Sequence, residues 1–557
     1  MPPARKLPAA VRSLGWFSGW LCVAVAGCSP KQQPRSPMPE PVHERAMLSF
    51  APSAADPSAK QRILAATDKL DAYFSERIQT GSATGLSVGI VLGGELVYSR
   101  GFGVQDVATK TPVGPDSAFR IASLTKSFTA MAILRLRDQG RLALDAPAES
   151  YVPELSKARG PTADSPPITV RMLLTHAGGL PWDDQWGPVS FGFSDEERDA
   201  LLASGISFAG VPGENYEYSN FGYALLGLIA ERVTGISFRD FVTREILNPL
   251  GMTGTVWDSA QVSPGRLAVG YRVEDGAGLT PEPRIASSFF APAGGLYTTL
   301  RDYARYMAFH LSAYPPRNEP EMAPLRRSSV RELHRGQRPW TLQATTDKNG
   351  VLSVYRGDYG FGWIESTTCR DNRRLEHSGW EPGYFSSVVL LPERSFGIVS
   401  LATTNGVRAT EGAIELLRQM DALPPITTLP PTMDLQRARD SVGQLFRQWD
   451  TQFVNQIFAP DSVHYVWFRK LEASFARLRR DHGVCDFTGA VSAEGRLHGY
   501  WRASCEKGAI DFEAFLAPTV PTRVAMLSWK ELLADERPPG ESTVPRIMVP
   551  QRSACPE

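Results

Sequence analysis

The sequence predicts a protein of the α/β (α+β) class, in which one large domain holds a sheet and an inserted helical subdomain. Strand-like runs at Leu86–Leu92 and Glu95–Phe102 flank Gly93-Gly94, which is a strong hairpin signal. Helical patterns then dominate from 124 to about 250. Strand patterns return near 361–366, 384–391 and 396–403. Strands from the beginning and the end of the domain, separated in the sequence by helices, predict an α/β arrangement in which they form one sheet.

The chain begins with the pattern of an exported protein. Basic residues precede an apolar run from Leu14 to Ala26, which is short for a membrane span. The run ends in the letters VAGC, which resemble the lipobox of bacterial lipoproteins, where the cysteine is acylated and everything before it is removed. We predict a signal peptide over 1–27 and lipidation of Cys28, which places the chain on the periplasmic side of the outer membrane if the host is Gram-negative. The alternative is a plain secretory signal with an incidental cysteine, and the mature chain is exported in both cases.

Two proline-rich stretches divide the rest of the chain. Residues 28–60 are rich in Pro, Ser, Ala and charge, and they are typical of a flexible tether. Residues 423–433 contain the letters LPPITTLPPT and are typical of a linker. These stretches delimit a large domain over 61–422 and a smaller domain over 434–557.

Helix-like and strand-like patterns fill both domains. The large domain opens with a helix-like pattern from Ile63 to Phe74 and ends with another at Glu411–Met420. The smaller domain has helix-like runs at Leu435–Ile457 and 467–481, which precede strand-like runs at Ile510–Leu516 and Val524–Trp529. This order suggests a small α+β domain, similar to the NTF2-like cones. It contains no catalytic pattern, and we interpret it as a module that stabilises the protein or positions peptidoglycan or substrate.

Composition and charge exclude several classes of function. The chain has 59 Lys+Arg and 59 Asp+Glu, whereas a nucleic-acid binder usually carries a basic excess on one domain. Its hydrophobic fraction of 42% and charged fraction of 21% are ordinary for a globular protein. No apolar stretch of about 18 residues follows the leader, so we expect membrane contact only through the lipid anchor. We expect no nucleic-acid partner, and the oligomeric state stays open.

Cysteine and histidine spacings argue against a metal site. The six cysteines include no C-x-x-C pair and the eight histidines include no H-E-x-x-H, so we expect no metal and no other cofactor. Besides Cys22 and Cys28, four cysteines remain, and their three possible disulfide connectivities stay open. Cys485 and Cys505 flank a turn-rich stretch and could join neighbouring strands. Such a disulfide would stabilise the domain by about 3 kcal/mol in the chain-entropy model.

A serine and a lysine three residues apart open an apolar-periodic helix. At helical spacing, Ser123 and Lys126 lie on one face, so the hydroxyl and the ammonium are neighbours. The first turn of a helix leaves backbone N–H groups free to stabilise an oxyanion. The lysine lowers the cost of deprotonating the hydroxyl. The pattern alone is weak, because serine is a favoured N-cap and lysine is a common surface residue.

Two further motifs make the Ser123–Lys126 pattern a more specific signal. Tyr218-Ser219-Asn220 and His377-Ser378-Gly379 follow the serine in that order. Together the three motifs resemble the signature of the serine β-lactamase-like superfamily, in the branch of class C β-lactamases, D-Ala-D-Ala carboxypeptidases and related esterases. The flanking letters PGENYEYSN, LNPLGMTGT and APAGGLYTT are similar to that branch too, and the resemblance covers about 63–420. It implies a β-lactamase/transpeptidase-like fold, with an antiparallel sheet flanked by helices and an inserted helical subdomain.

Resemblance and chemistry together assign roles to the first two motifs. Ser123 Oγ is the nucleophile that becomes acylated. Lys126 keeps it poised and stabilises the anion of Tyr218, whose ordinary pKa of about 10 would otherwise leave it protonated at neutral pH. Tyr218, as the phenolate or as a proton shuttle with Lys126, is then the general base for attack and the general acid for the leaving group. Asn220 orients Lys126 and the substrate carbonyl.

The third motif would lie on the strand of the protein that binds the substrate. The oxyanion hole would be the backbone N–H groups of Ser123 and Trp380, and Ser378 and Gly379 would bind substrate, with the glycine allowing close approach of the strand. His377 stands where the β-lactamases carry lysine. Because histidine titrates near pH 6.5, we expect the recognition of anionic substrates to weaken as the pH rises.

The resemblance implies a serine hydrolase that cleaves an amide or ester through a Ser123 acyl-enzyme. The substrate is a β-lactam, a D-Ala-D-Ala peptide of peptidoglycan or a carboxylic ester, and the sequence does not choose among these small molecules and peptides. The alternative is a penicillin- or peptidoglycan-binding lipoprotein of the same fold that does not turn over its ligand. A pure binder has no chemical use for Lys126 and Tyr218 together.

Overall fold

The computed structural model describes residues 57–532, apart from gaps at 159, 183–192, 275–277, 285–287, 322, 347–351, 368–370, 372, 405–408, 426–430, 461, 463–467 and 494. The predicted signal peptide and Cys28 therefore lie outside the described residues, as do most of the predicted tether and part of the predicted linker. Residues 533–557 of the smaller domain lie outside them too.

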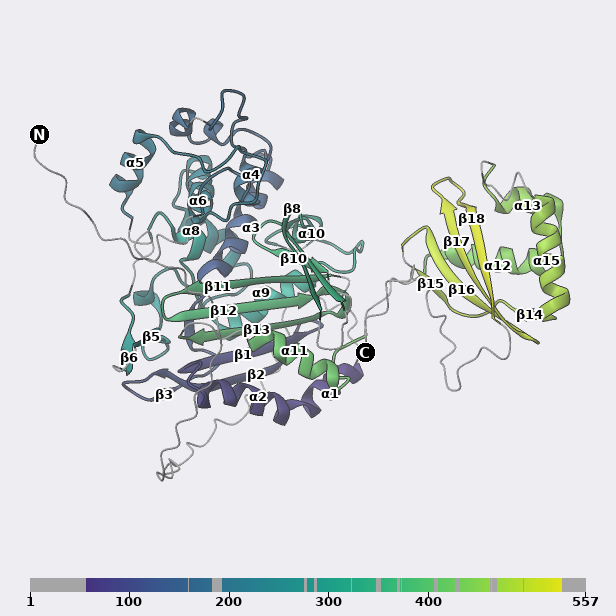
Figure 1. The fold of residues 1–557 in the computed structure, drawn as a ribbon, viewed down its shortest axis with the longest axis horizontal. Helices are drawn as coiled ribbons and strands as arrows, with labels where there is room; N and C mark the ends of the chain where they lie inside the picture. Colours follow the sequence, from purple (N-terminus) through teal and green to yellow (C-terminus); the bar gives the residue numbers. More distant parts are fainter. Residues whose placement is uncertain are drawn as a thin grey trace, which may run out of the picture. The chain divides into compact units, whose positions relative to one another are not determined.

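A nine-stranded sheet forms the centre of the large domain (Figure 1). Its strand order is β3-β2-β1-β13-β12-β11-β10-β9-β8, and every neighbouring pair is antiparallel. The strands are β1 (Gly85–Leu92), β2 (Glu95–Asp106), β3 (Thr111–Pro112), β8 (Arg338–Thr346), β9 (Leu352–Tyr359), β10 (Ile364–Thr367), β11 (Arg374–Glu381), β12 (Tyr384–Leu391) and β13 (Phe396–Thr403). The predicted antiparallel sheet is confirmed, because strands from the two ends of the domain pair as β1 with β13.

The central strands are buried on both faces, which explains why they are continuous apolar runs in the sequence. In β12, Val388 and Leu390 pack into one hydrophobic core, whereas Val389 and Leu391 pack into another on the opposite face. All eight residues of β1 and of β13 are buried as well. A strand with one solvated face would instead alternate polar and apolar residues.

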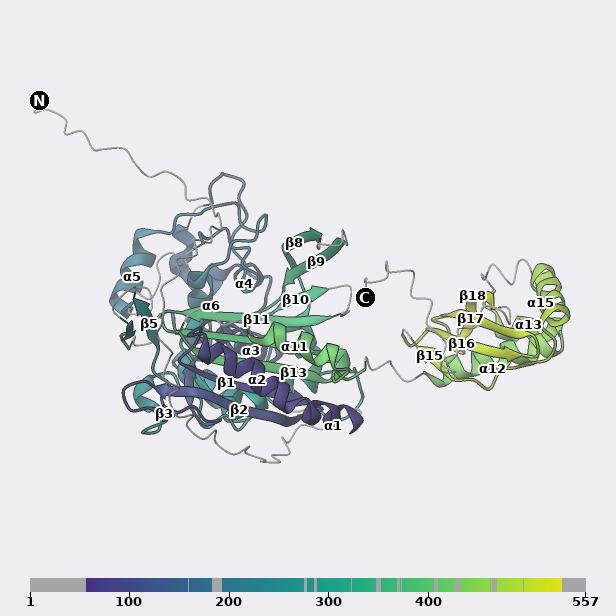
Figure 2. The same cartoon turned by 60° about the horizontal axis from the view of Figure 1, so that its bottom comes forward.

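Helices cover the two faces of this sheet (Figures 1 and 2). On one face lie α1 (Pro57–Ala65), α2 (Thr67–Gln79) and α11 (Ala409–Gln419), which share a core with the strands through residues such as Phe74 and Ile414. On the other face lie α3 (Thr125–Asp138) and α9 (Leu300–Leu311). The first four residues of α1 belong to the segment predicted as tether, so that boundary is wrong by a few residues.

The helical subdomain is inserted between β4 and β7, a short antiparallel pair. It contains α4 (Val170–Leu174), α5 (Asp195–Ser204), α6 (Asn220–Thr234), α7 (Phe238–Val242), a π-helical turn (Thr243–Leu247) and α8 (Ala291–Gly294). Around it lie β4 (Ala118–Arg120), β7 (Tyr297–Thr299), the hairpin of β5 (Tyr271–Glu274) and β6 (Gly278–Pro281), and α10 (Arg327–His334). The core of this subdomain continues into that of α3 and α9.

Two predicted elements differ from the structure for local reasons. The strand expected near 361–366 begins only at Ile364, because the backbone turns at Gly362, whose φ of +72° is in the left-handed region. The run Leu435–Ile457 is not one helix. It divides at Asp450, whose side chain accepts from the N–H groups of Gln452 and Phe453 and so caps a new helix.

The smaller domain has its own sheet and its own hydrophobic core. Its five strands follow the order β14-β16-β17-β18, with β15 paired to β16. They are β14 (Cys485–Asp486), β15 (Val491–Ala493), β16 (His498–Cys505), β17 (Gly508–Ala517) and β18 (Arg523–Leu532), and the helices are α12 (Met433–Arg447), α13 (Thr451–Ile457) and α15 (Phe468–His482). Met433 begins α12 although it falls in the predicted linker.

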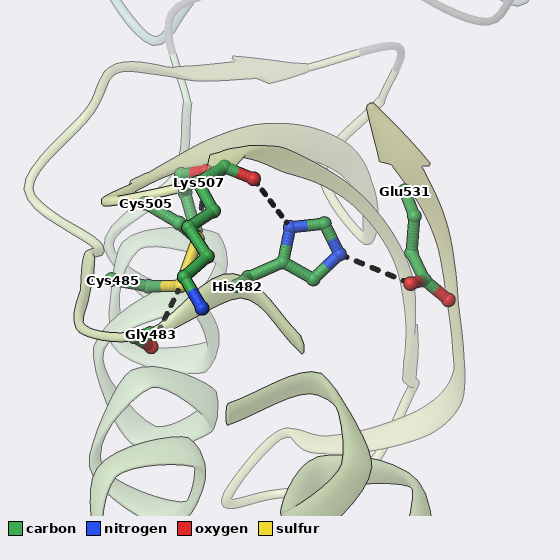
Figure 3. The surroundings of a disulfide bond; sticks show 7 residues. His482, Gly483, Cys485, Cys505, Lys507 and Glu531 are labelled. Atoms are coloured by element: carbon green, nitrogen blue, oxygen red, sulfur yellow. Dashed lines mark hydrogen bonds and ion pairs between the residues drawn. A yellow bond between two sulfur atoms is a disulfide. The ribbon is translucent and has the colours of Figure 1, made fainter. Parts of the chain in front are cut away.

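Cys485 and Cys505, the pair singled out from the sequence, form a disulfide between β14 and β16 (Figure 3). The imidazole of His482 lies beside it, with Nδ1 3.2 Å from the Lys507 carbonyl oxygen and Nε2 3.0 Å from a Glu531 carboxylate oxygen. These contacts join the end of α15 to the β16–β17 turn and to β18.

Among the described residues, no single helix is long and apolar enough to cross a membrane. Asn220–Thr234 and Phe238–Leu247 meet the length and composition criteria only when taken together, across a bend of 80°. Ten consecutive residues of the first of these helices are buried within the protein.

Candidate active site

Ser123 lies in the tight turn that joins β4 to α3. Residues Ala122–Leu124 form a single 3₁₀ turn, and α3 begins directly after it at Thr125. Ala122 has a φ of +47°, a left-handed conformation that is uncommon for any residue other than glycine. This sharp reversal presents the serine at the start of the helix, where backbone N–H groups lack partners within the helix.

Lys126 is fully buried, and three acceptors surround its ammonium group. Its Nζ lies 3.0 Å from Ser123 Oγ, 2.6 Å from Asn220 Oδ1 and 2.9 Å from the carbonyl oxygen of Ala293. An ammonium has three N–H donors, so these bonds compensate the loss of hydration. Residues from α3, α6 and α8 thus place one cation against the serine hydroxyl.

Tyr218 completes this group. Its hydroxyl donates to Ser123 Oγ at 2.9 Å, and Lys126 Nζ lies 4.8 Å from the centre of its ring. The tyrosine comes directly before Ser219, whose side chain caps α6 by accepting from the Gly222 N–H. The N-terminus of α6 therefore places both Tyr218 and Asn220 against the ammonium group of Lys126.

His176 holds the segment that carries Tyr218, a relation that the sequence motifs did not reveal. Its Nδ1 accepts from the Ser219 N–H at 3.0 Å, and its carbonyl oxygen accepts from the Glu217 N–H at 2.7 Å. The ring also packs against the Tyr218 ring, with centroids 4.3 Å apart. Burial, with the positive charge of Lys126 in addition, lowers the pKa of His176, so the imidazole stays neutral and able to accept. A positive φ of 55° at this position shows that the turn is held under strain.

Strand β11 brings the third motif beside Ser123. Among the described strands, β10 pairs with β11 only at Arg374–Glu376, so the edge beyond Glu376 faces the 3₁₀ turn of Ser123. A Cβ on Gly379 would overlap the carbonyl oxygen of Ile121, which explains why glycine is needed there. Ser378 is exposed, and Trp380 is 51% exposed.

The direction of the Trp380 N–H follows from the register of the hairpin. Glu381 pairs with Tyr384 across the two-residue turn between β11 and β12. Because backbone groups in an antiparallel strand point alternately to its two sides, the Trp380 N–H points away from β12, toward the open edge. The structure thus brings together all the residues of the three motifs, and the Ser123 and Trp380 segments face one another.

His377 behaves differently from the expectation drawn from its type. The side chain is 7% exposed, with Nδ1 2.7 Å from the Ser378 carbonyl oxygen and Nε2 3.1 Å from the Tyr359 hydroxyl. Burial, helped by the positive charge of Lys126, lowers the pKa of His377 to about 4. The imidazole is neutral near pH 7, with both nitrogens engaged by the protein. The expected titration near pH 6.5 is therefore wrong, and so is the pH dependence inferred from it.

Within the described residues, no group of three or more His, Cys, Asp or Glu side chains could hold a metal ion. The site instead combines a hydroxyl, a buried ammonium, a phenol and an open strand edge. This set is suited to nucleophilic attack on a carbonyl, followed by transfer of the proton to a leaving group.

Comparisons with known proteins connect the chain that carries this site to β-lactamases and penicillin-binding proteins. The sequence profile of the family described as Beta-lactamase matches residues 70–420. Protein flp of Staphylococcus aureus (strain COL) is 29% identical over 338 residues, which cover 60% of this chain and 63% of that protein. Penicillin-binding protein 4* of Bacillus subtilis (strain 168) is 28% identical over 314 residues, which cover 53% of this chain and 63% of that protein. The matched region thus spans less than two thirds of the length of either relative.

The fold is similar to that of a solved structure, the octameric penicillin-binding protein homologue from Pyrococcus abyssi. The TM-score is 0.55 at 22% sequence identity, and the match covers 84% of this chain and 96% of that chain. At this level of identity the similarity concerns the fold alone.

Proposed function

Because the chain belongs to the β-lactamase family of serine hydrolases, we propose that it cleaves an amide or ester bond through an acyl-enzyme on Ser123. The observation that carries the proposal is that two polar groups contact Ser123 Oγ. Lys126 Nζ lies 3.0 Å from it, and the Tyr218 hydroxyl lies 2.9 Å from it. A serine hydroxyl is a weak nucleophile unless an adjacent group takes its proton. Tyr218 is placed to take that proton, and the charge of Lys126 favours the anions that form, so the two groups together support a covalent mechanism.

The proposed reaction has two halves. Tyr218 reacts as the phenolate, which the positive charge of Lys126 stabilises, and accepts the proton of Ser123 as Oγ bonds to the substrate carbonyl carbon. The oxyanion that forms accepts from the Ser123 and Trp380 N–H groups. Tyr218 returns the proton to the departing amine or alcohol, and the acyl group stays on Ser123. Water then attacks the acyl-enzyme by the same proton route and releases the acid.

The substrate class follows from the bond broken and from the family. A β-lactam, a D-Ala-D-Ala peptide and a carboxylic ester each present a carbonyl with a leaving group, and each fits the same chemistry. The edge of β11 beyond Glu376, which the described residues of β10 do not pair with, favours a substrate with some extended character, because a peptide-like chain is able to pair with the Trp380 backbone there. A small ester needs only the carbonyl contacts.

The leader supports a second proposal, which is that the mature protein is exported and anchored by lipid on Cys28. The basic start, the short apolar run and the terminal VAGC letters carry it. In the native bacterial host, a Cys28→Ala variant should lose incorporation of labelled fatty acid and leave the membrane fraction. Unchanged labelling of that variant would contradict the proposal.

The proposed hydrolase is tested by intact mass measurement of the chain from Ser29 onward. The protein is mixed with a penicillin and, separately, with a short-chain p-nitrophenyl ester. Turnover of the ester, or an acyl adduct on Ser123 that is released with time, is the expected result. A penicillin adduct that is not released, without turnover of any reagent, would instead indicate the non-turnover binding protein. If neither reagent labels or turns over, the catalytic assignment is wrong.

A further inference from the structure

A buried ion pair joins the two segments that carry the proposed oxyanion hole. The Arg120 guanidinium at the end of β4 contacts the Glu381 carboxylate at the end of β11, and the two residues are 3% and 5% exposed. Arg120 comes three residues before Ser123, whereas Glu381 comes directly after Trp380. The pair therefore connects the backbone beside one proposed N–H donor to the backbone beside the other.

Uncharged contacts at the same junction show how closely the two segments are fitted. The Ser386 hydroxyl of β12 donates to the Ile121 carbonyl oxygen at 2.8 Å. The same carbonyl oxygen leaves no room for a side chain at Gly379. The Arg120 guanidinium also lies over the Tyr297 ring of β7, 5.6 Å from its centre. A small shift of residues 120–121 against β11 and β12 would thus disturb several contacts at once.

We infer that the Arg120–Glu381 pair is a positioning device that holds the Ser123 and Trp380 N–H groups at the separation an oxyanion requires. The inference rests on the proposed acyl-enzyme function. Neither side chain takes a proton or forms a bond in the reaction. Both act through the backbone segments to which they belong.

The physical argument is that a buried ion pair is a poor way to gain stability but a good way to fix geometry. Removing two charges from water costs free energy that their attraction often fails to recover, so an apolar pair of similar size would be as stable. Separating the two residues would, however, leave an uncompensated buried charge, so the pair resists movement of one segment away from the other. Oxyanion stabilisation depends on donors that are fixed before the reaction, and a misplacement of about 1 Å can cost about 10²-fold in rate.

The charge of Glu381 makes this device sensitive to pH. Burial raises the pKa of Glu381 to about 7, against the opposing pull of Arg120 and Lys126. The other titratable groups that face the pair are the phenols of Tyr297 on β7 and Tyr384 on β12. The carboxylate is ionised above about pH 7 and protonated below it. The pair therefore weakens as the pH falls, and kcat should fall with it.

The test compares the pH dependence of kcat and KM for ester hydrolysis in the wild-type chain and in Glu381→Gln. We expect a wild-type kcat that falls below about pH 7. In Glu381→Gln, kcat should be lower by about 10²-fold, with KM changed by less than about threefold and no fall in kcat between pH 6 and 8. A Glu381→Gln protein that keeps the wild-type kcat and its fall below pH 7 would overturn the inference.

Two further variants separate positioning from folding. Asp371→Asn removes another buried carboxylate, which pairs with Arg394 at 3.3 Å and Arg418 at 2.8 Å, and its kcat should keep the wild-type pH profile. The double variant Arg120→Met/Glu381→Leu replaces the pair by apolar side chains, so it should stay folded yet show the low, pH-independent kcat.

The outcomes distinguish this inference from the proposed function. Equal losses in Glu381→Gln and Asp371→Asn would assign the pair a merely structural role and overturn the inference. Full activity of the folded double variant would overturn it too. If the wild-type chain itself fails to form an acyl-enzyme or to turn over ester, the proposed function fails instead.

Discussion

Replacing Ser123 with alanine is expected to abolish the proposed hydrolysis, with a fall in kcat of at least about 10⁴-fold. The reason is that Ser123 Oγ is the hydroxyl that lies 3.0 Å from Lys126 Nζ and 2.9 Å from the Tyr218 hydroxyl, so its removal takes away the group that would be acylated. The change is measured by ester turnover at saturating substrate and by intact mass after exposure to a penicillin. The adduct should be absent from the variant.

The matched control is Ser263→Ala, which removes an exposed serine of the same domain. This variant should retain wild-type turnover and adduct formation. Ser123→Ala should also keep the wild-type thermal transition, because the deletion leaves the rest of α3 unchanged. Residual turnover above about a tenth of the wild-type rate would place the nucleophile elsewhere.

Replacing Tyr218 with phenylalanine is expected to lower kcat by roughly 10²–10⁴-fold. The substitution keeps the ring that packs against His176, with centroids 4.3 Å apart, and removes only the hydroxyl that donates to Ser123 Oγ. The loss should therefore fall on proton transfer and not on folding. Rates of acylation and deacylation, followed separately by rapid-quench mass measurement, should both decrease, because the same proton route serves both halves.

Tyr216→Phe is the control for this prediction. Tyr216 lies two residues earlier on the same segment, and its ring packs edge-on against His176 with centroids 5.7 Å apart. Because the sequence motif requires asparagine two residues after the tyrosine, only Tyr218 fits it. Tyr216→Phe should change kcat by less than about tenfold. A Tyr218→Phe loss below that same limit would assign the proton transfer to another group.

Much of the fold could be predicted because its strongest signals are local. The strands β1, β2, β12 and β13 were all expected near their observed positions, since apolar runs and the Gly93-Gly94 turn identify them within a few residues. Strands β8 and β9 were not expected. Their runs, Arg338–Thr346 and Leu352–Tyr359, contain many polar and charged residues, and they become strands by pairing at the edge of an existing sheet.

Some features of the candidate site could likewise be predicted from the sequence, and others could not. Ser123 and Lys126 could be paired from the sequence, because one turn of helix determines that residues three apart share a face. The neutrality of His377 could not be inferred, since it depends on burial, on Lys126 and on a bond to Tyr359. The support that His176 gives to Tyr218 was equally hidden, because it arises between two segments that only the fold brings together.

The sequence by itself determined the order of the motifs, the residue types that perform the proposed chemistry and the α/β class. Only the tertiary structure decided which of those groups meet, how each is protonated and which buried charges hold them. The physical reason is that periodicity and turn chemistry act over a few residues. Electrostatic environment depends on every neighbour in space, and the pairing of Arg120 with Glu381 exists only once the fold brings the ends of β4 and β11 together.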